Sequence, residues 1–253
     1  MQPTSTTFMA ASRNALVAAT ALLAAHVALA VNLVPGVPTA LPGTTLADQS
    51  FLAGTVLEDM TIPVSIPIFC GGGCQDPFLV VSTVTGTAQS RVVRETATGT
   101  LDFYWRITND ASTDPFFSIQ QFRLGDFLST SYDADWRIDG LGNTAPTSAL
   151  LWPAPLDGTI FFSFISATSS GITAGGGSYF LLMHTSATQY AASAWFTVEA
   201  GTIDFGDEGG SSSPYATFAP LAVPEPQQSA LLALGLGAVV LAARRRKSAA
   251  SGA

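Results

Sequence analysis

The sequence predicts an all-β protein, an antiparallel β-sandwich of the jelly-roll or immunoglobulin-like type. From Phe78 onward, apolar and polar residues alternate with a period of two, as they do in half-buried strands. Clusters of Gly, Pro, Asn, Asp and Ser separate the short β-branched and aromatic runs. No window between Asn32 and Val223 has a long apolar stripe at helical spacing. These three observations together favour one β domain without a helical layer.

The clearest predicted strand spans residues 100–110. The apolar face of this strand consists of Leu101, Phe103, Trp105 and Ile107, and its other face of Asp102, Tyr104, Arg106 and Thr108. Further candidate strands are residues 78–88, 90–95, 117–124, 134–139, 159–167, 178–185 and 194–201. About eight short strands separated by turns are typical of a sandwich.

The first thirty residues have the three zones of a secretory signal peptide. Arg13 supplies the positive charge, residues 15–25 are apolar, and Ala28 to Ala30 form a small-x-small cleavage pattern. The proline-rich segment that follows cannot continue a helix. We therefore expect a signal peptidase to cleave after Ala30, which leaves residues 31–222 as the exported domain.

Two cysteines, Cys70 and Cys74, are separated by three glycines that let the chain fold back sharply. Export places them in an oxidising compartment, so the sequence predicts a local disulfide. Free thiols and a zinc site remain alternatives. A zinc site requires two more soft ligands, and the exported region offers only His184.

The segment near the C-terminus predicts a short transmembrane helix. Residues Ala230 to Ala243 carry no charge and span about 21 Å as a helix, compared with a bilayer core of about 30 Å. Gln227 to Ser229 can lengthen this run at one end. The basic block that follows consists of Arg244, Arg245, Arg246 and Lys247. By the positive-inside rule this block holds the C-terminus in the cytoplasm.

The motif just before this helix consists of Val223, Pro224, Glu225 and Pro226. Together with the apolar run and the basic end it resembles the PEP-CTERM sorting signal of exported proteins of Gram-negative bacteria, here residues 223–247. The same tail is also described as an ice-binding protein C-terminal domain. Residues 99–112, 169–190 and 216–226 resemble a recurrent type of PEP-CTERM β-protein.

The resemblance implies a partner and a location. An exosortase, a membrane cysteine protease, is expected to recognise the motif and cleave the tail. The protein is then anchored in the membrane before processing and lies afterwards at the cell surface or outside the cell. Such proteins accompany exopolysaccharide and biofilm systems, so exopolysaccharide is a candidate partner.

The charge distribution argues against nucleic acid as a partner. Between residues 31 and 226 the chain has five Arg, no Lys and 18 Asp and Glu, a net charge of −13. A body this acidic repels phosphate backbones.

Residues 133–140 concentrate three carboxylates, Asp133, Asp135 and Asp139. Calcium takes several oxygen ligands, so these residues are a candidate calcium site. The EF-hand pattern fails, because Arg137 and Thr144 stand where oxygen ligands are needed. The alternative is a solvated acidic turn, and the same two interpretations apply to residues 204–210.

The sequence contains no catalytic constellation, and we expect no enzyme activity. His184 is the only histidine in the exported region, and no G-x-S-x-G motif is present. Thr83, Thr85 and Thr87 share one face of a predicted strand, as exposed threonines often do. The favoured function is a structural or adhesive role at the cell surface or in an extracellular matrix. The alternative is a carbohydrate-binding module, with or without calcium, and a hydrolase is the least favoured.

Overall fold

The computed structural model describes residues 30–221, apart from 130, 157 and 205–207. The predicted signal peptide, the sorting motif, the transmembrane helix and the basic block therefore lie outside the described residues. Within the described part, no helix is long and apolar enough to cross a bilayer.

The described residues form an all-β structure, and a single 3₁₀ turn, η1 (Ser50–Leu52), is the only helical element among them. The strands are β1 (Val31–Asn32), β2 (Gly54–Phe69), β3 (Val80–Glu95), β4 (Leu101–Asn109), β5 (Phe117–Gly125), β6 (Asp133–Arg137), β7 (Ser148–Leu151), β8 (Ile160–Ser163), β9 (Ile165–Ser166), β10 (Ser169–Ser170), β11 (Phe180–His184), β12 (Tyr190–Thr202), β13 (Gly209–Ser211) and β14 (Tyr215–Pro220).

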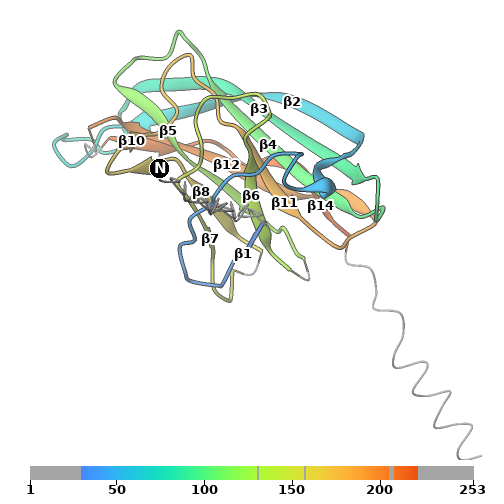
Figure 1. Ribbon diagram of the computed structural model, residues 1–253. Coiled ribbons are helices and arrows are strands. Elements are labelled where there is room, and N and C mark those ends of the chain that lie inside the picture. The colour runs from blue at the N-terminus through green and yellow to red at the C-terminus, as the bar shows by residue number, and fades with distance from the viewer. Residues whose placement is uncertain (1–29, 130, 157, 205–207, 222–253) are drawn as a thin grey trace, which may run out of the picture.

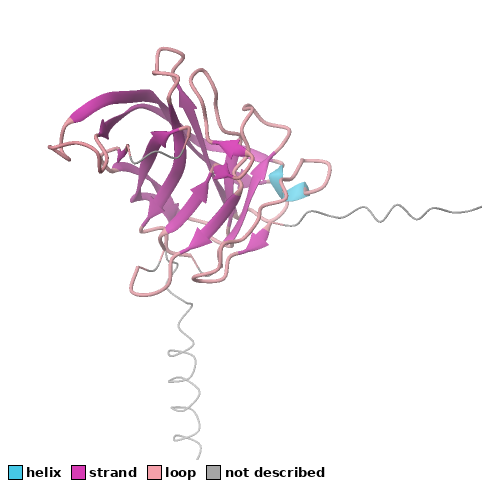
Figure 2. Ribbon diagram, turned by 90° about the vertical axis from the view of Figure 1, so that its left-hand side faces the viewer, coloured by secondary structure: helices cyan, strands magenta, loops and turns pink. Residues whose placement is uncertain are grey.

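Twelve strands form one sheet, in the order β1-β6-β11-β4-β3-β2-β13-β12-β5-β8-β7, with β14 paired to β12. β9 and β10 form a small separate ladder. All of these strand pairs are antiparallel. The sheet curls on itself, as Figures 1 and 2 show. The all-β antiparallel prediction is confirmed, whereas the jelly-roll or immunoglobulin-like subtype stays a prediction.

Aromatic side chains fill the space inside the curl. Trp105 on β4 lies 6.0 Å from Phe122 on β5 and 5.7 Å from Phe127, measured between ring centroids. Phe196 on β12 stacks on Phe122 at 5.3 Å. β4 and β5 are not neighbours in the sheet, so these contacts join parts of it that curling brings face to face. Burying such rings is the main stabilising contribution to the fold.

The 16-residue strand β2 is not among the strands predicted from the sequence, because Pro63 and Pro67 interrupt its pattern. Both prolines pair in register with β3, opposite Thr87 and Thr83. On its other side β2 pairs with β13 only at Phe69. Proline is tolerated where a strand edge has no partner, because its missing N–H leaves no ladder bond unmade. No residue of β13 is paired in register with Pro63 or Pro67, which explains why prolines that argue against a central strand occur here.

Strand β4 is buried on both faces near its start, although its sequence alternates. Leu101, Phe103 and Trp105 face the main core as predicted. Asp102 and Tyr104, on the opposite face, are also buried, at 0% and 3% exposure. Tyr104 packs in a second small cluster that includes Leu52 of η1. The segment before β2 therefore covers this part of the sheet.

We predict that Thr217→Val lowers the free energy of unfolding by about 1–3 kcal/mol, because it leaves a buried indole N–H without an acceptor. Thr217 is fully buried on β14. Its Oγ1 accepts a hydrogen bond from Trp105 Nε1 at 2.8 Å and donates one to Ser90 Oγ at 3.0 Å. Chemical denaturation of the purified protein measures the change. The matched control is Thr61→Val on the exposed side of β2. Equal effects of the two substitutions would contradict a structural role for the buried hydroxyl.

Candidate functional site

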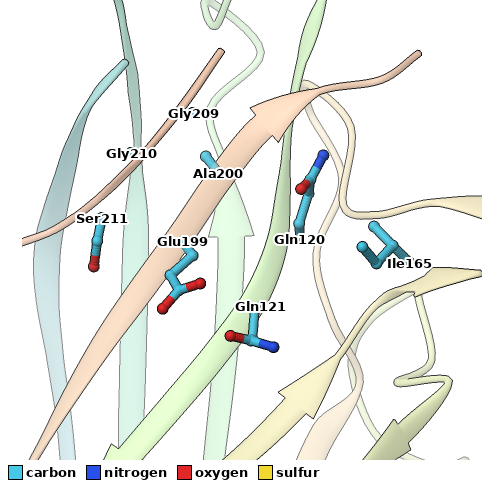
Figure 3. A pocket seen from close by; sticks show the side chains of 8 residues that line it. All are labelled: Gln120, Gln121, Ile165, Glu199, Ala200, Gly209, Gly210 and Ser211. Carbon is cyan, nitrogen blue, oxygen red and sulfur yellow. The ribbon is translucent and has the colours of Figure 1, made fainter. Parts of the chain in front are cut away.

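A hollow of about 450 Å³ opens where β12, β5 and β13 meet. The residues that line it are Gln120, Gln121, Ile165, Glu199, Ala200, Gly209, Gly210 and Ser211. Glu199 pairs in register with Gln121 on one side and with Ser211 on the other, so the three side chains lie on one row. Figure 3 shows Glu199 between these two neighbours. We call this hollow the Glu199 pocket.

Two polar side chains of the Glu199 pocket have no hydrogen-bond partner among the described residues. Neither Glu199 nor Gln121 makes a side-chain hydrogen bond or ion pair with any described residue. Burial raises the pKa of the Glu199 carboxyl, while the Arg123 guanidinium partly offsets this by lowering it. Gln120 donates from Nε2 to the carbonyl of Thr202 at 2.9 Å. The pocket thus presents a half-buried carboxyl and two amide groups to a ligand.

Two backbone features shape the pocket. The register of β5 against β12 shifts between Glu199 and Ala200, so Gln120 is the extra residue of a β-bulge. Gly210 allows β13 to approach β2 closely, because a Cβ at this position would lie 1.8 Å from the carbonyl oxygen of Pro67. A side chain at Gly210 is therefore incompatible with this wall of the pocket.

An aromatic and cationic row lies beside the pocket on the same face of the sheet. The Arg123 guanidinium lies 5.1 Å from the Trp195 ring centroid and 5.2 Å from that of Phe161. Trp152 continues the row, 5.4 Å from Phe161. The Trp195 ring covers Gly125, where a Cβ would lie 2.1 Å from it. Each member of the row thus contacts its neighbour.

The Glu199 pocket and this row are not predicted from the sequence, although the predicted strands contain most of their residues. Alternation does place Glu199, Trp195 and Arg123 on outward-facing positions. What the sequence lacks is the pairing of β12 with β5 and β13, which brings these residues together.

The three predicted calcium ligands are not brought together. Among the described residues no three His, Cys, Asp or Glu side chains are grouped to hold a metal ion. Asp133 accepts a hydrogen bond from Asn32 Nδ2 at 3.0 Å, and Asp139 forms a 2.6 Å ion pair with Arg137. Asp135 is fully buried and accepts from the backbone N–H of Gly43 at 2.8 Å. Burial raises the pKa of Asp135 to about 6. Alternation alone does not reveal that each carboxylate has a different partner.

The predicted cysteine loop is closed by a Cys70–Cys74 disulfide, with the two Cα atoms 6.0 Å apart. It lies at the turn between β2 and β3, where Phe78 is 81% exposed. The predicted threonines of β3 lie on one face of the strand, but they differ in exposure. Thr85 and Thr87 are half-buried, Thr83 is exposed, and Thr87 Oγ1 lies 2.6 Å from Thr108 Oγ1.

His184 lies in a polar pair at the edge of the second cluster. Its Nδ1 is 2.7 Å from Oδ1 of the fully buried Asp102, its register partner on β4. The Phe51 ring packs against the imidazole at a centroid distance of 4.4 Å. The hydrogen bond with Asp102 raises the pKa of His184, and the negative charges of Glu95 and Asp133 raise it further. His184 and Asp102 thus form a polar pair across β11 and β4, and the Phe51 ring packs against it.

We predict that His184→Gln destabilises the protein more at about pH 6 than at about pH 9. The folded-state pKa of His184 is raised above its unfolded value of about 6.5. Protonated His184 therefore stabilises the fold below that value, and this contribution is lost as the pH rises through the folded-state pKa. Denaturation at both pH values measures the difference.

The control for this prediction is the same substitution in an Asp102→Asn background, where its pH dependence is expected to become smaller, because only the charges of Glu95 and Asp133 then raise the pKa of His184. A loss of stability that is equal at both pH values would show that the ion pair contributes nothing.

The comparisons with known proteins concern the tail. A family model described as the PEP-CTERM protein-sorting motif matches residues 222–247. No curated protein and no solved structure matches the chain. The matched segment contains the predicted motif from Val223 to Pro226, the apolar run and the basic block. The motif indicates an exported protein that is sorted to the cell envelope and processed by an exosortase, a membrane protease. The chain is therefore a protein that carries the PEP-CTERM sorting signal.

Proposed function

We propose that the exported β domain is a non-catalytic adhesive protein of the cell surface or extracellular matrix, and that it holds a neutral glycan of an exopolysaccharide in the Glu199 pocket. The observation that carries the proposal is the open carboxyl and amide row of Glu199 and Gln121 beside the Trp195–Arg123–Phe161 row. The sorting motif supports the location, because it directs the chain to the envelope.

The chemistry of the pocket suits a sugar. Each sugar hydroxyl donates one hydrogen bond and accepts others, and planar carboxyl and amide groups offer both kinds of partner. A volume of about 450 Å³ lies within the range of small-molecule sites. The neighbouring aromatic rings supply an apolar surface on the same side of the sheet, against which the C–H face of a sugar can pack.

The charge of the domain favours a neutral ligand. The net charge of −13 between residues 31 and 226 repels polyanions at long range. Glu199 adds a carboxyl to the pocket itself. A neutral glycan is repelled neither by the net charge of the domain nor by the Glu199 carboxyl.

Two features favour binding without hydrolysis and without calcium. Glycosidases use two carboxyl groups across the scissile bond, and Glu199 is the only Asp or Glu among the residues that line the pocket. The candidate calcium ligands Asp135 and Asp139 have protein partners on another part of the sheet. We therefore propose that chelators leave glycan binding unchanged.

Glu199→Gln and Gln121→Ala are each expected to weaken glycan binding about tenfold, because each removes one or two hydrogen bonds to the sugar. A glycan array with neutral and acidic members identifies the glycan that binds best. Calorimetric titration of that glycan, with and without EDTA, measures the affinity.

The matched control is Glu58→Gln, an identical change on an exposed part of β2. Equal losses from Glu58→Gln and Glu199→Gln would refute the pocket, and turnover of the glycan would refute a purely adhesive function.

Processing is expected to remove both ends of the chain. In a host with an exosortase, the intact mass of the surface form is expected to lack residues 1–30 and the segment after about Pro226. Glu225→Ala is expected to keep the C-terminal tail, because it alters the recognition motif, whereas Glu208→Ala is expected to be processed normally. A surface form that retains Arg244 to Lys247 would show that the tail is a permanent anchor.

A further inference from the structure

A second hollow, of about 480 Å³, lies at the end of β4, away from the Glu199 pocket in strand order. It is lined by β4 and by three loops, with the residues Arg106, Thr108, Asn109, Asp110, Ala111, Gly142, Asn143, Gly175, Gly176 and Gly177. We call it the Arg106 hollow. No residue of the Glu199 pocket takes part in it.

Arg106 differs from the other arginines that the structure describes. Arg91 and Arg137 form 2.6 Å ion pairs with Asp59 and Asp139. Arg94 donates to the carbonyl of Gly99 at 2.8 Å, and Arg123 lies over two aromatic rings. Arg106 alone among them has neither a hydrogen bond, an ion pair nor a ring contact with a described residue. Its Nε is buried without a partner, as are those of Arg91 and Arg123. A half-buried guanidinium without a counter-charge is costly unless something else compensates it.

The wall opposite the guanidinium is built of glycines. A Cβ at Gly177 would lie 3.1 Å from Nη2 of Arg106 and 3.3 Å from Cγ2 of Thr108. The backbone N–H of Gly177 donates to Oδ1 of Asn143 at 3.0 Å, which orients that amide. The Nδ2 group of Asn143 then remains a free donor among the described residues. The absence of side chains at Gly175 to Gly177 is what leaves the hollow open.

The Arg106 hollow contains both a positively and a negatively charged group. Arg106 and the Asn143 amide donate hydrogen bonds, while Asp110 supplies a carboxylate that has no partner among the described residues. Asn109, 2% exposed, has a buried Oδ1 without a partner. A ligand that matches this set carries one carboxylate for Arg106 and a hydroxyl that donates to Asp110. A guanidinium takes a carboxylate with two parallel hydrogen bonds, which a single hydroxyl cannot replace.

The long-range charge limits the ligand further. The domain's net charge of −13 repels a ligand with many negative charges, and one arginine compensates only one of them. We infer that the Arg106 hollow binds a singly charged hydroxycarboxylate, such as a uronate, either free or as an isolated unit of an otherwise neutral saccharide. This site does not depend on the proposed Glu199 pocket, and each can be disproved without the other.

Calorimetric titration of the purified protein with glucuronate, glucose and glucuronate methyl ester tests the inference. Of the three probes, only glucuronate carries a carboxylate, so it is expected to bind. Glucose and the methyl ester are expected to bind at least about tenfold more weakly. A disaccharide with one glucuronate unit distinguishes the sources. Tighter binding than that of free glucuronate points to a saccharide, and equal binding points to the free acid. Polygalacturonate is expected to bind no more tightly per uronate unit, because its repeated charges are repelled.

Substitutions in the Arg106 hollow test whether glucuronate binds there. Arg106→Gln is expected to lower the affinity for glucuronate about tenfold or more, and Arg106→Lys by less, because Lys keeps the charge but loses the planar fork. Gly177→Ala keeps Arg106 but places a methyl group in the hollow beside its guanidinium, so it is also expected to weaken glucuronate binding. This variant serves as the test when the Arg106 variants are unstable. Arg94→Gln, with the same loss of charge on β3, and Glu199→Gln are the controls and are expected to bind glucuronate normally.

Equal binding of glucose and glucuronate would overturn the inference. It would also be overturned if Arg106→Gln and Gly177→Ala both bound like the unaltered protein, or if polygalacturonate bound more tightly than glucuronate per unit. Loss of glucuronate binding in Glu199→Gln with Arg106→Gln unaffected would place the acid in the other pocket. None of these results depends on whether a neutral glycan binds at Glu199.

Discussion

The packing of Trp105 against β5 and β14 is the contact on which the rest of the structure depends. The ring lies between Phe122 and Phe127, and its N–H is bonded to the buried Thr217. β4 and β14 lie apart in strand order, so this contact holds the sheet in its curled form. An open sheet of twelve strands would leave one face of large aromatic residues in water. Curling removes that face from solvent, and it also decides which residues are left outside.

The outward face becomes a place for binding wherever the regular alternation of side chains is interrupted. At the Glu199 pocket the interruption is the bulge at Gln120 together with the glycines of β13. At the Arg106 hollow it is the glycine run from Gly175 to Gly177. Both hollows therefore arise where side chains are missing or displaced, beside β12 at the Glu199 pocket and between β4 and three loops at the Arg106 hollow.

Much of the fold could be predicted from local pattern. Apolar and polar residues alternate along β12 and, apart from the bulge at Gln120, along β5 in the sequence as in the structure. β11 is instead a run of four buried apolar residues, and β4 is buried on both faces near its start. β2 was missed because prolines are acceptable only at its unpaired edge, and edge position is a property of the whole sheet. The pattern of residues 133–140 did not reveal the ion pair of Asp139 or the burial of Asp135. The sorting motif could be recognised in the sequence, because its parts follow one another along the chain.

The candidate sites could not be predicted from the sequence, because each depends on contacts between segments that are far apart along the chain. Outward position does not distinguish an arginine that has a partner from one that lacks it. Arg91 and Arg106 both occupy half-buried positions on neighbouring strands, β3 and β4, yet only Arg91 has a carboxylate within reach. The strong excess of acidic residues makes that difference informative. In a domain with five arginines and 18 acidic residues, a counter-charge is the easiest partner to acquire. Arg94 and Arg123 also lack an ion pair, but a carbonyl contacts Arg94 and two aromatic rings contact Arg123. Arg106 has neither kind of contact and faces a glycine wall, which fits a ligand that supplies the charge.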